Sequence, residues 1–276
     1  MSEAPIVISI VNHKGGVLKT TSTVNLAAAL AEKERQVLVI DMDMQQNLST
    51  YLLGRRQYDP DAPTLCDAIL KKAPLDELIR KTHVEGLYVV PCDEDFIEVD
   101  LSLVSISARE LALRKALEKT ASIGEFDFVL LDCPPGMSLT TVNALAASDY
   151  FLIPCEAAYL PIQGLEQLGT IIQRQLRDVA PELMLLGVVM TKYHANHNIC
   201  RTADEAVRDR LGEFVTDARV RVNTKAAAAP SKQQTIIEYE GSDRGRGTED
   251  YRALADEVLE RVELFERERV KVAANG

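Results

Sequence analysis

The chain alternates between short, nearly continuous apolar runs and longer segments whose apolar residues recur every three or four positions. Such runs are typical of parallel strands buried on both faces, and the second spacing is typical of amphipathic helices. Strands are expected over 6–11, 36–41, 87–91, 126–132, 150–154, 184–192 and 218–222. Helices are expected over 64–70, 74–79, 96–104, 108–121, 139–147, 161–180, 203–211 and 249–268, with a polar loop over 54–63. This order predicts an α/β fold, a mostly parallel, doubly wound sheet flanked by helices on both faces.

A glycine pair and a Lys-Thr-Thr sequence follow the first apolar run and open the first helix. The segment reads Lys14-Gly15-Gly16-Val17-Leu18-Lys19-Thr20-Thr21. Glycines let backbone N–H groups surround a phosphate, and the N-terminus of the next helix attracts an anion. We expect Lys19 to reach the β- and γ-phosphates of a nucleotide and the Thr20 hydroxyl to bind Mg²⁺. Strand, loop and helix together predict a P-loop NTPase.

Two positions of this loop depart from the general pattern. Leu18 stands where the pattern has glycine, and His13 stands where it has its first glycine. A side chain at position 18 is strained if the backbone there requires a positive φ angle. The alternative interpretation is a glycine-rich turn between strand and helix that binds no ligand.

Three carboxylates stand at the ends of predicted strands. Asp41 and Asp43 follow the second strand, and Asp132 ends the strand over 126–132. Ligands of open α/β sheets bind at the carboxyl ends of the strands. We therefore expect Asp43 to orient a water molecule at the γ-phosphate, and Asp41 and Asp132 to hold Mg²⁺ with its water shell. The alternative is that these residues are polar strand ends that cap the following helices.

Three blocks of the chain resemble the ParA/MinD family of deviant Walker A ATPases. Residues 14–21 resemble its Walker A motif, with a signature lysine at Lys14. Residues 41–49 resemble its switch I, with Met44 in place of proline. Residues 132–135 resemble its Walker B and switch II. The likeness covers most of the chain. On these motifs the chain is identified as a member of that family, of the ParA/Soj partition type.

The resemblance implies an ATPase with ATP and Mg²⁺ as cofactors. Two subunits of such a protein sandwich two ATP molecules, and Lys14 of each reaches into the other site. It implies catalytic roles for Lys14, Lys19 and Asp43, and Mg²⁺ held by Thr20, Asp41 and Asp132. It implies that Thr191 and Lys192 lie beside the adenine. It also implies that every residue of the phosphate loop contacts the nucleotide, namely Lys14, Gly15, Gly16, Val17, Leu18, Lys19, Thr20 and Thr21. Arg221 stands where the family has a proline beside the adenine, so the resemblance does not define which residues form the adenine pocket of this chain.

Composition places few further limits on the chain. It has 276 residues, of which 46% are hydrophobic and 26% charged, and a net charge of −11. We expect one domain, 1–276, with a C-terminal helix. No apolar stretch approaches the roughly 20 residues of a membrane span, and the N-terminus lacks signal-peptide features, so a cytoplasmic protein is expected. The five cysteines are scattered, and Cys133 and Cys155 are expected in the core.

The resemblance also implies partners. ATP-bound dimers of the family bind DNA without sequence specificity, and a small basic protein of the ParB kind activates them. The expected result is a nucleoid-associated protein with no stable membrane association. The candidate DNA-binding residues are Arg201, Arg219, Arg221, Lys225, Arg244 and Arg246. Acids are interleaved with them, so a solvated surface is the alternative.

Two other functions stay open. Leu18 could make the protein a nucleotide-binding switch or pseudo-ATPase, or the chain could be a MinD-like division regulator. The mixed charges over 259–268 do not favour the last, because membrane-binding helices of that kind are basic. The cargo, whether chromosome, plasmid or protein assembly, is not indicated by the sequence.

Overall fold

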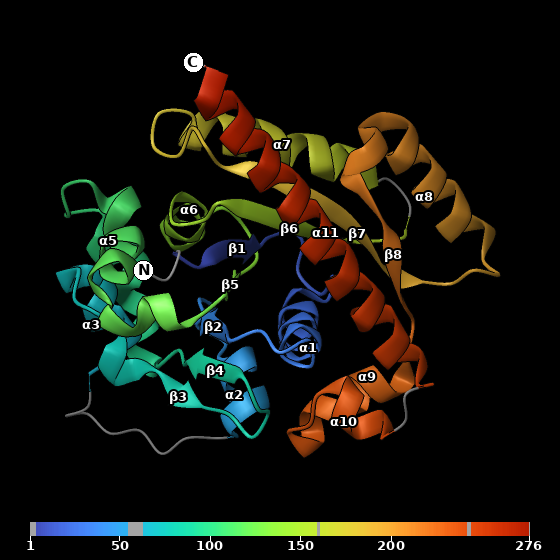
Figure 1. The fold of residues 1–276 in the computed structure, drawn as a ribbon, viewed down its shortest axis with the longest axis horizontal. Coiled ribbons are helices and arrows are strands. Elements are labelled where there is room, and N and C mark those ends of the chain that lie inside the picture. Colours follow the sequence, from blue (N-terminus) through green and yellow to red (C-terminus); the bar gives the residue numbers. More distant parts are fainter. Residues whose placement is uncertain (1–3, 55–62, 159–160, 242–243, 276) are drawn as a thin grey trace.

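One twisted sheet organises the molecule (Figure 1). The computed structural model describes residues 4–54, 63–158, 161–241 and 244–275, so most of the loop expected over 54–63 lies outside the described residues. Within them the strand order is β3-β4-β2-β5-β1-β6-β7-β8. The strands are β1 Ile6–Ile10, β2 Val37–Asp41, β3 Arg80–Lys81, β4 Leu87–Val90, β5 Phe128–Asp132, β6 Tyr150–Glu156, β7 Met184–Tyr193 and β8 Val215–Arg221. All neighbouring strands pair in parallel except β3, which runs antiparallel to β4.

Helices cover both faces of the sheet. On one face pack α1 Lys19–Ala31, α2 Asn47–Leu53, α10 Ile236–Glu240 and α11 Arg246–Asn275. On the other pack α3 Leu65–Lys71, α4 Val99–Leu103, α5 Ala112–Lys119, α6 Leu139–Ala146, α7 Pro161–Leu176 and α8 Asn198–Leu211. The remaining helix, α9 Thr224–Ala228, follows β8. Alternate strand residues serve the two cores, as Val7 and Ile8 of β1 do. The predicted fold class is confirmed.

Strand order brings three loops to one edge of the sheet. β5 lies between β1 and β2, and Asp132 is in register with Ile10 on one side and Asp41 on the other. The segments that follow β1, β2 and β5 therefore leave the sheet side by side at its carboxyl edge.

Several helix boundaries differ from those predicted. The segment over 108–121 begins as a 3-10 turn, Arg109–Leu111, because Ala108 adopts a left-handed conformation, and only Ala112–Lys119 is α-helical. Residues 74–79 form only the 3-10 turn Asp76–Leu78. α7 ends at Leu176, four residues before the predicted end at residue 180. α8 begins at Asn198, before the predicted residue 203, and its first turn places Cys200 in the core.

Within the described ranges, no helix combines the length and apolar character that crossing a bilayer requires.

Candidate functional site

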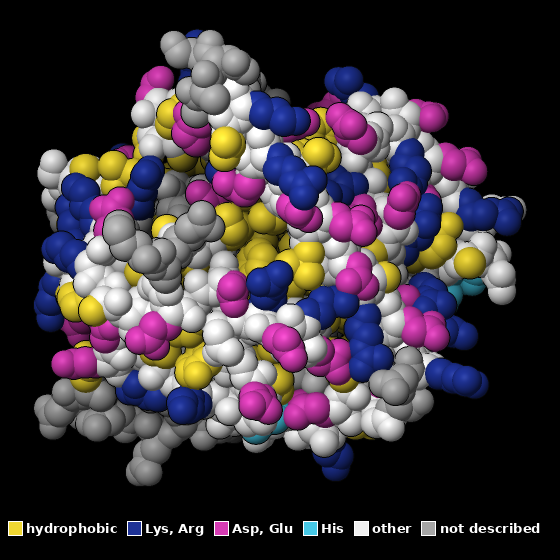
Figure 2. All heavy atoms as spheres, viewed as in Figure 1, with side chains coloured by type: hydrophobic (Ala, Val, Ile, Leu, Met, Phe, Trp, Pro, Cys, Tyr) yellow, Lys and Arg dark blue, Asp and Glu magenta, His cyan; other side chains and the backbone are white. Residues whose placement is uncertain are grey.

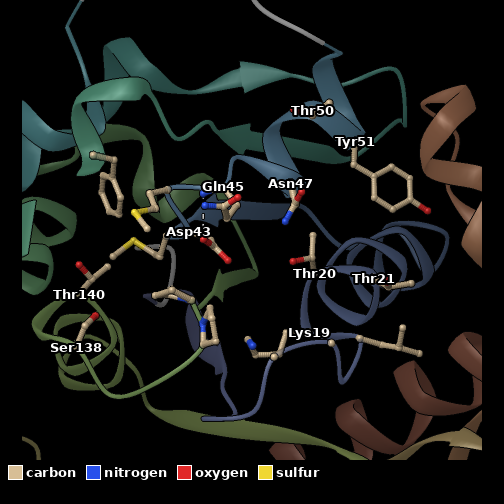
Figure 3. A pocket seen from close by; sticks show the side chains of 18 of the residues that line it. Lys19, Thr20, Thr21, Asp43, Gln45, Asn47, Thr50, Tyr51, Ser138 and Thr140 are labelled. Atoms are coloured by element: carbon tan, nitrogen blue, oxygen red, sulfur yellow. Dashed lines mark hydrogen bonds between the residues drawn. The ribbon is translucent and has the colours of Figure 1, made fainter. Parts of the chain in front are cut away.

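A cleft of about 960 Å³ opens at the carboxyl edge of the sheet (Figure 3). Its walls come from the loop after β1 with the start of α1, from the segment after β2, and from the two prolines after β5. Lys19, Thr20 and Asp43 point from these segments toward the same space (Figure 3). The structure thus brings together side chains that the sequence predicts to act on one nucleotide.

The loop after β1 is held in place from both sides. The Asn12 amide donates to the Pro154 carbonyl over 2.8 Å and accepts the Lys14 N–H over 3.0 Å. The Thr191 hydroxyl donates to the Val17 carbonyl over 3.1 Å. A Cβ added at Gly16 would meet nothing within 4 Å, but Gly16 has a φ of +74°, which glycine adopts without strain. Thr191, predicted to lie beside the adenine, therefore uses its hydroxyl to brace the phosphate loop.

Leu18 has the left-handed backbone that strains a residue with a Cβ atom. Its φ is 68° and its ψ is 33°, at the residue that precedes α1. A left-handed conformation costs a residue with a Cβ roughly 1–2 kcal/mol relative to its ordinary regions. Leu18 therefore holds a backbone conformation that glycine adopts without strain, and it is strained there.

Lys19 is the first residue of α1 and is buried. Its Nζ lies 3.4 Å from the Lys14 carbonyl oxygen. Burial lowers the pKa of Lys19, and the nearby Asp132 carboxylate opposes that change. A buried ammonium at the start of a helix is suited to bind a polyphosphate.

Asp132 has no exposed surface, and one of its oxygens lacks a partner. The Thr23 hydroxyl donates to Oδ1 over 3.1 Å, whereas Oδ2 has no hydrogen-bond partner among the described residues. Burial, with a smaller contribution from Asp41, raises the pKa of Asp132 to about 8. An unpaired buried carboxylate oxygen beside the Thr20 hydroxyl fits a hydrated Mg²⁺, which prefers oxygen ligands.

Asp41 is fully buried, and both of its oxygens accept hydrogen bonds. Oδ2 accepts from the Ser49 amide over 2.8 Å and the Ser49 hydroxyl over 2.6 Å; Oδ1 accepts from the Asp43 amide over 3.2 Å. Burial raises its pKa to about 6. Asp41 thus caps the first turn of α2, which is the alternative role that the sequence suggests for a carboxylate at a strand end. Its role in holding Mg²⁺ stays a prediction.

Asp43 is 8% exposed, and its side chain faces the cleft (Figure 3). Its Oδ1 accepts the Gln45 amide over 3.0 Å, which fixes the carboxylate near the mouth of the phosphate loop.

Lys14 points away from this cleft and pairs with a carboxylate of its own subunit. Its Nζ lies 2.7 Å from Glu156 Oε2, at the end of β6, and Lys192 Nζ lies 3.4 Å from Glu156 Oε1. Both lysines lower the pKa of Glu156, and the hydrogen bond from Lys14 makes the largest contribution. The structure therefore holds Lys14 at the edge of the site, and Lys192 belongs to the same ion-pair group.

The six candidate DNA-binding residues fall into two groups. Arg219 donates to Asp204 over 2.6 Å and Arg221 to Asp250 over 2.7 Å, so both take part in partly buried ion pairs. Arg201, Lys225, Arg244 and Arg246 are exposed. On the face shown in Figure 2, basic and acidic side chains are interleaved.

Sequence reasoning did not single out three residues that shape the site. Thr23 binds Asp132, Ser49 binds Asp41, and Glu156 binds Lys14. Thr23 follows Thr20 by three positions on the same helix, and Glu156 ends a predicted strand as Asp132 does. Both patterns were available as signals in the sequence.

The fold and the site define a P-loop ATPase. A family model described as an AAA domain matches residues 6–185. The chain is 37% identical to the chromosome partitioning protein ParA of Caulobacter vibrioides over 99% of this chain and 100% of that protein. It is 35% identical to the sporulation initiation inhibitor protein Soj of Bacillus subtilis over 91% of this chain and 97% of that one.

A solved structure extends the likeness to a bound nucleotide. The Mycobacterium smegmatis protein described as cobyrinic acid a,c-diamide synthase, with an ATP analogue and magnesium, aligns with a TM-score of 0.70 and 29% identity. The match covers 87% of this chain and 98% of that one. The chain belongs to the ParA/Soj partitioning proteins of the ParA/MinD ATPase family.

Proposed function

We propose that this protein is a partitioning ATPase that binds Mg²⁺-ATP in the cleft, forms a dimer around it, and hydrolyses it slowly to move a cargo over DNA. One observation carries the proposal of an Mg²⁺-nucleotide site. Asp132 presents a buried oxygen that has no hydrogen-bond partner among the described residues, beside Lys19 and Thr20, and such an oxygen is costly to keep unless a ligand uses it.

Each side chain has a part that follows from its place. Backbone N–H groups of residues 15–20 and the ammonium of Lys19 bind the phosphates. Thr20 and Asp132 hold Mg²⁺, and Asp41 keeps the segment after β2 in place. Bound Mg²⁺ neutralises charge on the phosphates. Asp43 orients the attacking water, because its carboxylate is fixed and faces the cleft.

The Lys14 side chain has a second position in the proposed dimer. In the single subunit its ammonium is neutralised by Glu156. In the dimer Lys14 leaves Glu156 and reaches the partner's phosphates, where it stabilises charge in the transition state. Because Lys14 exchanges the Glu156 carboxylate for the phosphates bound by the partner, this movement depends on the partner's nucleotide.

Phosphate release from ATP tests the chemical part of the proposal. Asp43→Ala should bind Mg²⁺-ATP with unchanged affinity and release phosphate at least about tenfold more slowly, because it loses the group that orients water. Asp209→Ala, on the exposed side of α8, is the control and should match the parent. If the parent binds ATP but releases no phosphate, the nucleotide-switch alternative is correct. Equal rates for Asp43→Ala and the parent would remove Asp43 from the mechanism.

We also propose that the exposed basic residues, with Lys225 first, bind DNA without sequence specificity as part of a cytoplasmic, nucleoid-associated dimer. Lys225 is exposed at the start of α9 and has no acidic partner among the described residues. The ion pairs of Arg219 and Arg221 give these two a structural part instead. A dimer doubles a modest patch, which partly offsets the net charge of −11.

Titration of a labelled random duplex, with Asp43→Ala and Mg²⁺-ATP, tests DNA binding. Binding should need ATP and weaken as salt rises, because phosphate contacts release counterions. Lys225→Glu should weaken it without changing ATP affinity, whereas Arg177→Glu, just after α7, makes the same charge change elsewhere. Equal effects of the two substitutions would place the DNA-binding surface elsewhere.

A further inference from the structure

Three buried hydroxyl groups gather where α1 meets two other helices. α1 contacts α2, α10 and α11 on one face of the sheet (Figure 1). Ser22 of α1 and Tyr251 of α11 have no exposed surface, and Tyr51 of α2 is 3% exposed. None of their three hydroxyl oxygens has a hydrogen-bond partner among the described residues. We call these three residues the hydroxyl cluster.

The electrostatics of the two tyrosines show that the cluster occupies one region. Burial raises the pKa of Tyr51 to about 12, and the nearby Asn25 amide opposes that rise. Burial also raises the pKa of Tyr251, which the Ser22 hydroxyl opposes and Tyr51 adds to. Ser22 and Asn25 are three positions apart on α1 and therefore lie on the same helical face. The two tyrosines thus meet α1 at adjacent points.

Tyr51 connects the cluster to the nucleotide cleft. Its ring lines the cleft beside Thr50, whereas its hydroxyl is directed away from Lys19 and Asp43 (Figure 3). α2 follows Asp43 by only a few residues, so a ligand that orders the segment after β2 also orders this helix. A buried hydroxyl without a partner is costly, and a movement that supplies partners is therefore favourable.

Asn25 connects the cluster to α10. Its Nδ2 donates to the Thr21 carbonyl over 2.7 Å, and its Oδ1 accepts the Ile236 amide over 2.7 Å. Ile236 is the first residue of α10 and is fully buried. An amide carbonyl has two lone pairs, so Asn25 Oδ1 can accept the Tyr51 hydroxyl without releasing Ile236.

We propose that Tyr51 is a positioning residue through which the nucleotide fixes α10 and the first turns of α11. When Mg²⁺-ATP orders the segment after β2, α2 closes on α1 and the Tyr51 hydroxyl donates to Asn25. The Ser22 and Tyr251 hydroxyls then bond to each other. Because these hydrogen bonds form only in the nucleotide-bound protein, they couple the cleft to the two helices. The coupling rests on the proposed function, whereas the unpaired hydroxyls of the nucleotide-free protein do not.

Thermal unfolding with and without Mg²⁺-ATP tests this coupling, in an Asp43→Ala background so that the nucleotide persists. Tyr51→Phe keeps the ring that lines the cleft and removes only the hydroxyl. Without nucleotide its melting temperature should stay the same or rise, because this hydroxyl makes no hydrogen bond. ATP should raise the melting temperature by about 2–4 °C less than in the background protein, and should bind about fivefold more weakly. A lower melting temperature without nucleotide would overturn the proposal, since it would reveal a hydroxyl that is already paired.

Hydrogen exchange at saturating Mg²⁺-ATP separates positioning from weaker binding. In the background protein ATP should slow exchange over residues 15–22 and over 234–252. In Tyr51→Phe the first range should stay protected and the second should lose its protection. Equal protection of 234–252 in both proteins would contradict the proposal. Protection of 15–22 alone in the background protein would overturn the coupling only, whereas protection of neither range would overturn the proposed function as well.

A matched control is Tyr88→Phe, which removes a hydroxyl from a ring that packs against Phe126 on β4, away from the cluster. Its response to ATP should equal that of the background protein. Tyr251→Phe should reduce the ATP-induced shift as Tyr51→Phe does, and the double variant should lose less than the sum of the two, because both act in one network. A control as impaired as Tyr51→Phe, or strictly additive losses, would remove the hydroxyl cluster from the coupling.

Discussion

The two edges of the sheet satisfy their charged groups in different ways. At the amino edge, Arg269 of α11 lies over the Tyr150 ring at 4.8 Å, pairs with Glu266 over 3.0 Å and donates to the Glu182 carbonyl over 2.9 Å. Asp149 there accepts the Val7 amide over 2.8 Å. At the carboxyl edge, Asp132 has a buried oxygen without a hydrogen-bond partner in the part of the chain that the structure describes, and Leu18 has a strained backbone. The amino edge is largely paired within the chain, although Arg269 Nε is buried without a hydrogen-bond partner among the described residues. The carboxyl edge keeps Asp132 Oδ2, a group that a ligand can use.

The largest effect should come from removing the buried ammonium at the carboxyl edge. Lys19→Ala should lower Mg²⁺-ATP affinity at least about a hundredfold, because the β- and γ-phosphates lose their nearest cation. Equilibrium dialysis with labelled ATP measures it. Lys33→Ala, a lysine paired with Asp256 on the surface, should bind as the parent does. A small effect of Lys19→Ala would mean that the phosphates lie elsewhere.

Asp132→Asn should stabilise the nucleotide-free protein by about 2 kcal/mol at pH 7, because the parent must take up a proton at Asp132 when it folds and the variant need not. With a folded pKa of about 8, Asp132 holds its proton where the unfolded chain has lost it. The parent's stability therefore falls as pH rises from about 4 to about 8. Asp41, with a pKa of about 6, contributes only to the lower part of that range.

Chemical denaturation between pH 6 and pH 8 isolates Asp132. The parent should lose stability across this window and Asp132→Asn should lose much less. Mg²⁺-ATP should raise the melting temperature of the parent and have little effect on the variant. A variant as sensitive to pH as the parent would contradict an unpaired carboxylate.

Arg269→Ala tests the amino edge. It should lower the free energy of unfolding by about 1–2 kcal/mol, because a partly buried cation loses two kinds of partner, and leave ATP affinity unchanged. Arg267→Ala, whose side chain is 69% exposed, should change stability by less than about 0.5 kcal/mol. Weaker ATP binding by Arg269→Ala would show that the two edges are coupled.

The smallest effect is expected at Leu18. Leu18→Gly removes a left-handed non-glycine residue but adds freedom to the unfolded chain, so stability should change by no more than about 1 kcal/mol. ATP binding should tighten or turnover should rise by a few-fold, since no Cβ then stands beside the phosphates. Unchanged affinity and rate would mean that the loop already accommodates leucine.

Much of the carboxyl edge follows from local sequence, and that is why it could be predicted. Apolar runs place the strands, and a strand followed by Gly-Gly and Lys-Thr-Thr places Lys19. The strain at Leu18 followed from one missing glycine. These features depend on neighbouring residues in the chain, so the fold class and the loop were predicted.

Contacts between distant residues could not be predicted in the same way. Glu156 meets Lys14 across 142 positions, and Arg221 meets Asp250 across 29. No periodicity encodes these partners, since they depend on how β6 and α11 are placed in three dimensions. For that reason Lys14 was expected in a partner's site only, and Arg219 and Arg221 were expected on a DNA-binding surface.

Hydrogen exchange with and without Mg²⁺-ATP tests the contrast between the two edges most directly. Asp43→Ala is used so that the nucleotide persists. We expect ATP to slow exchange over residues 12–22, 41–50 and 132–140, and to leave 149–151 and 262–270 unchanged. Protection confined to the amino edge, or no protection at all, would contradict an ATP site at the carboxyl edge.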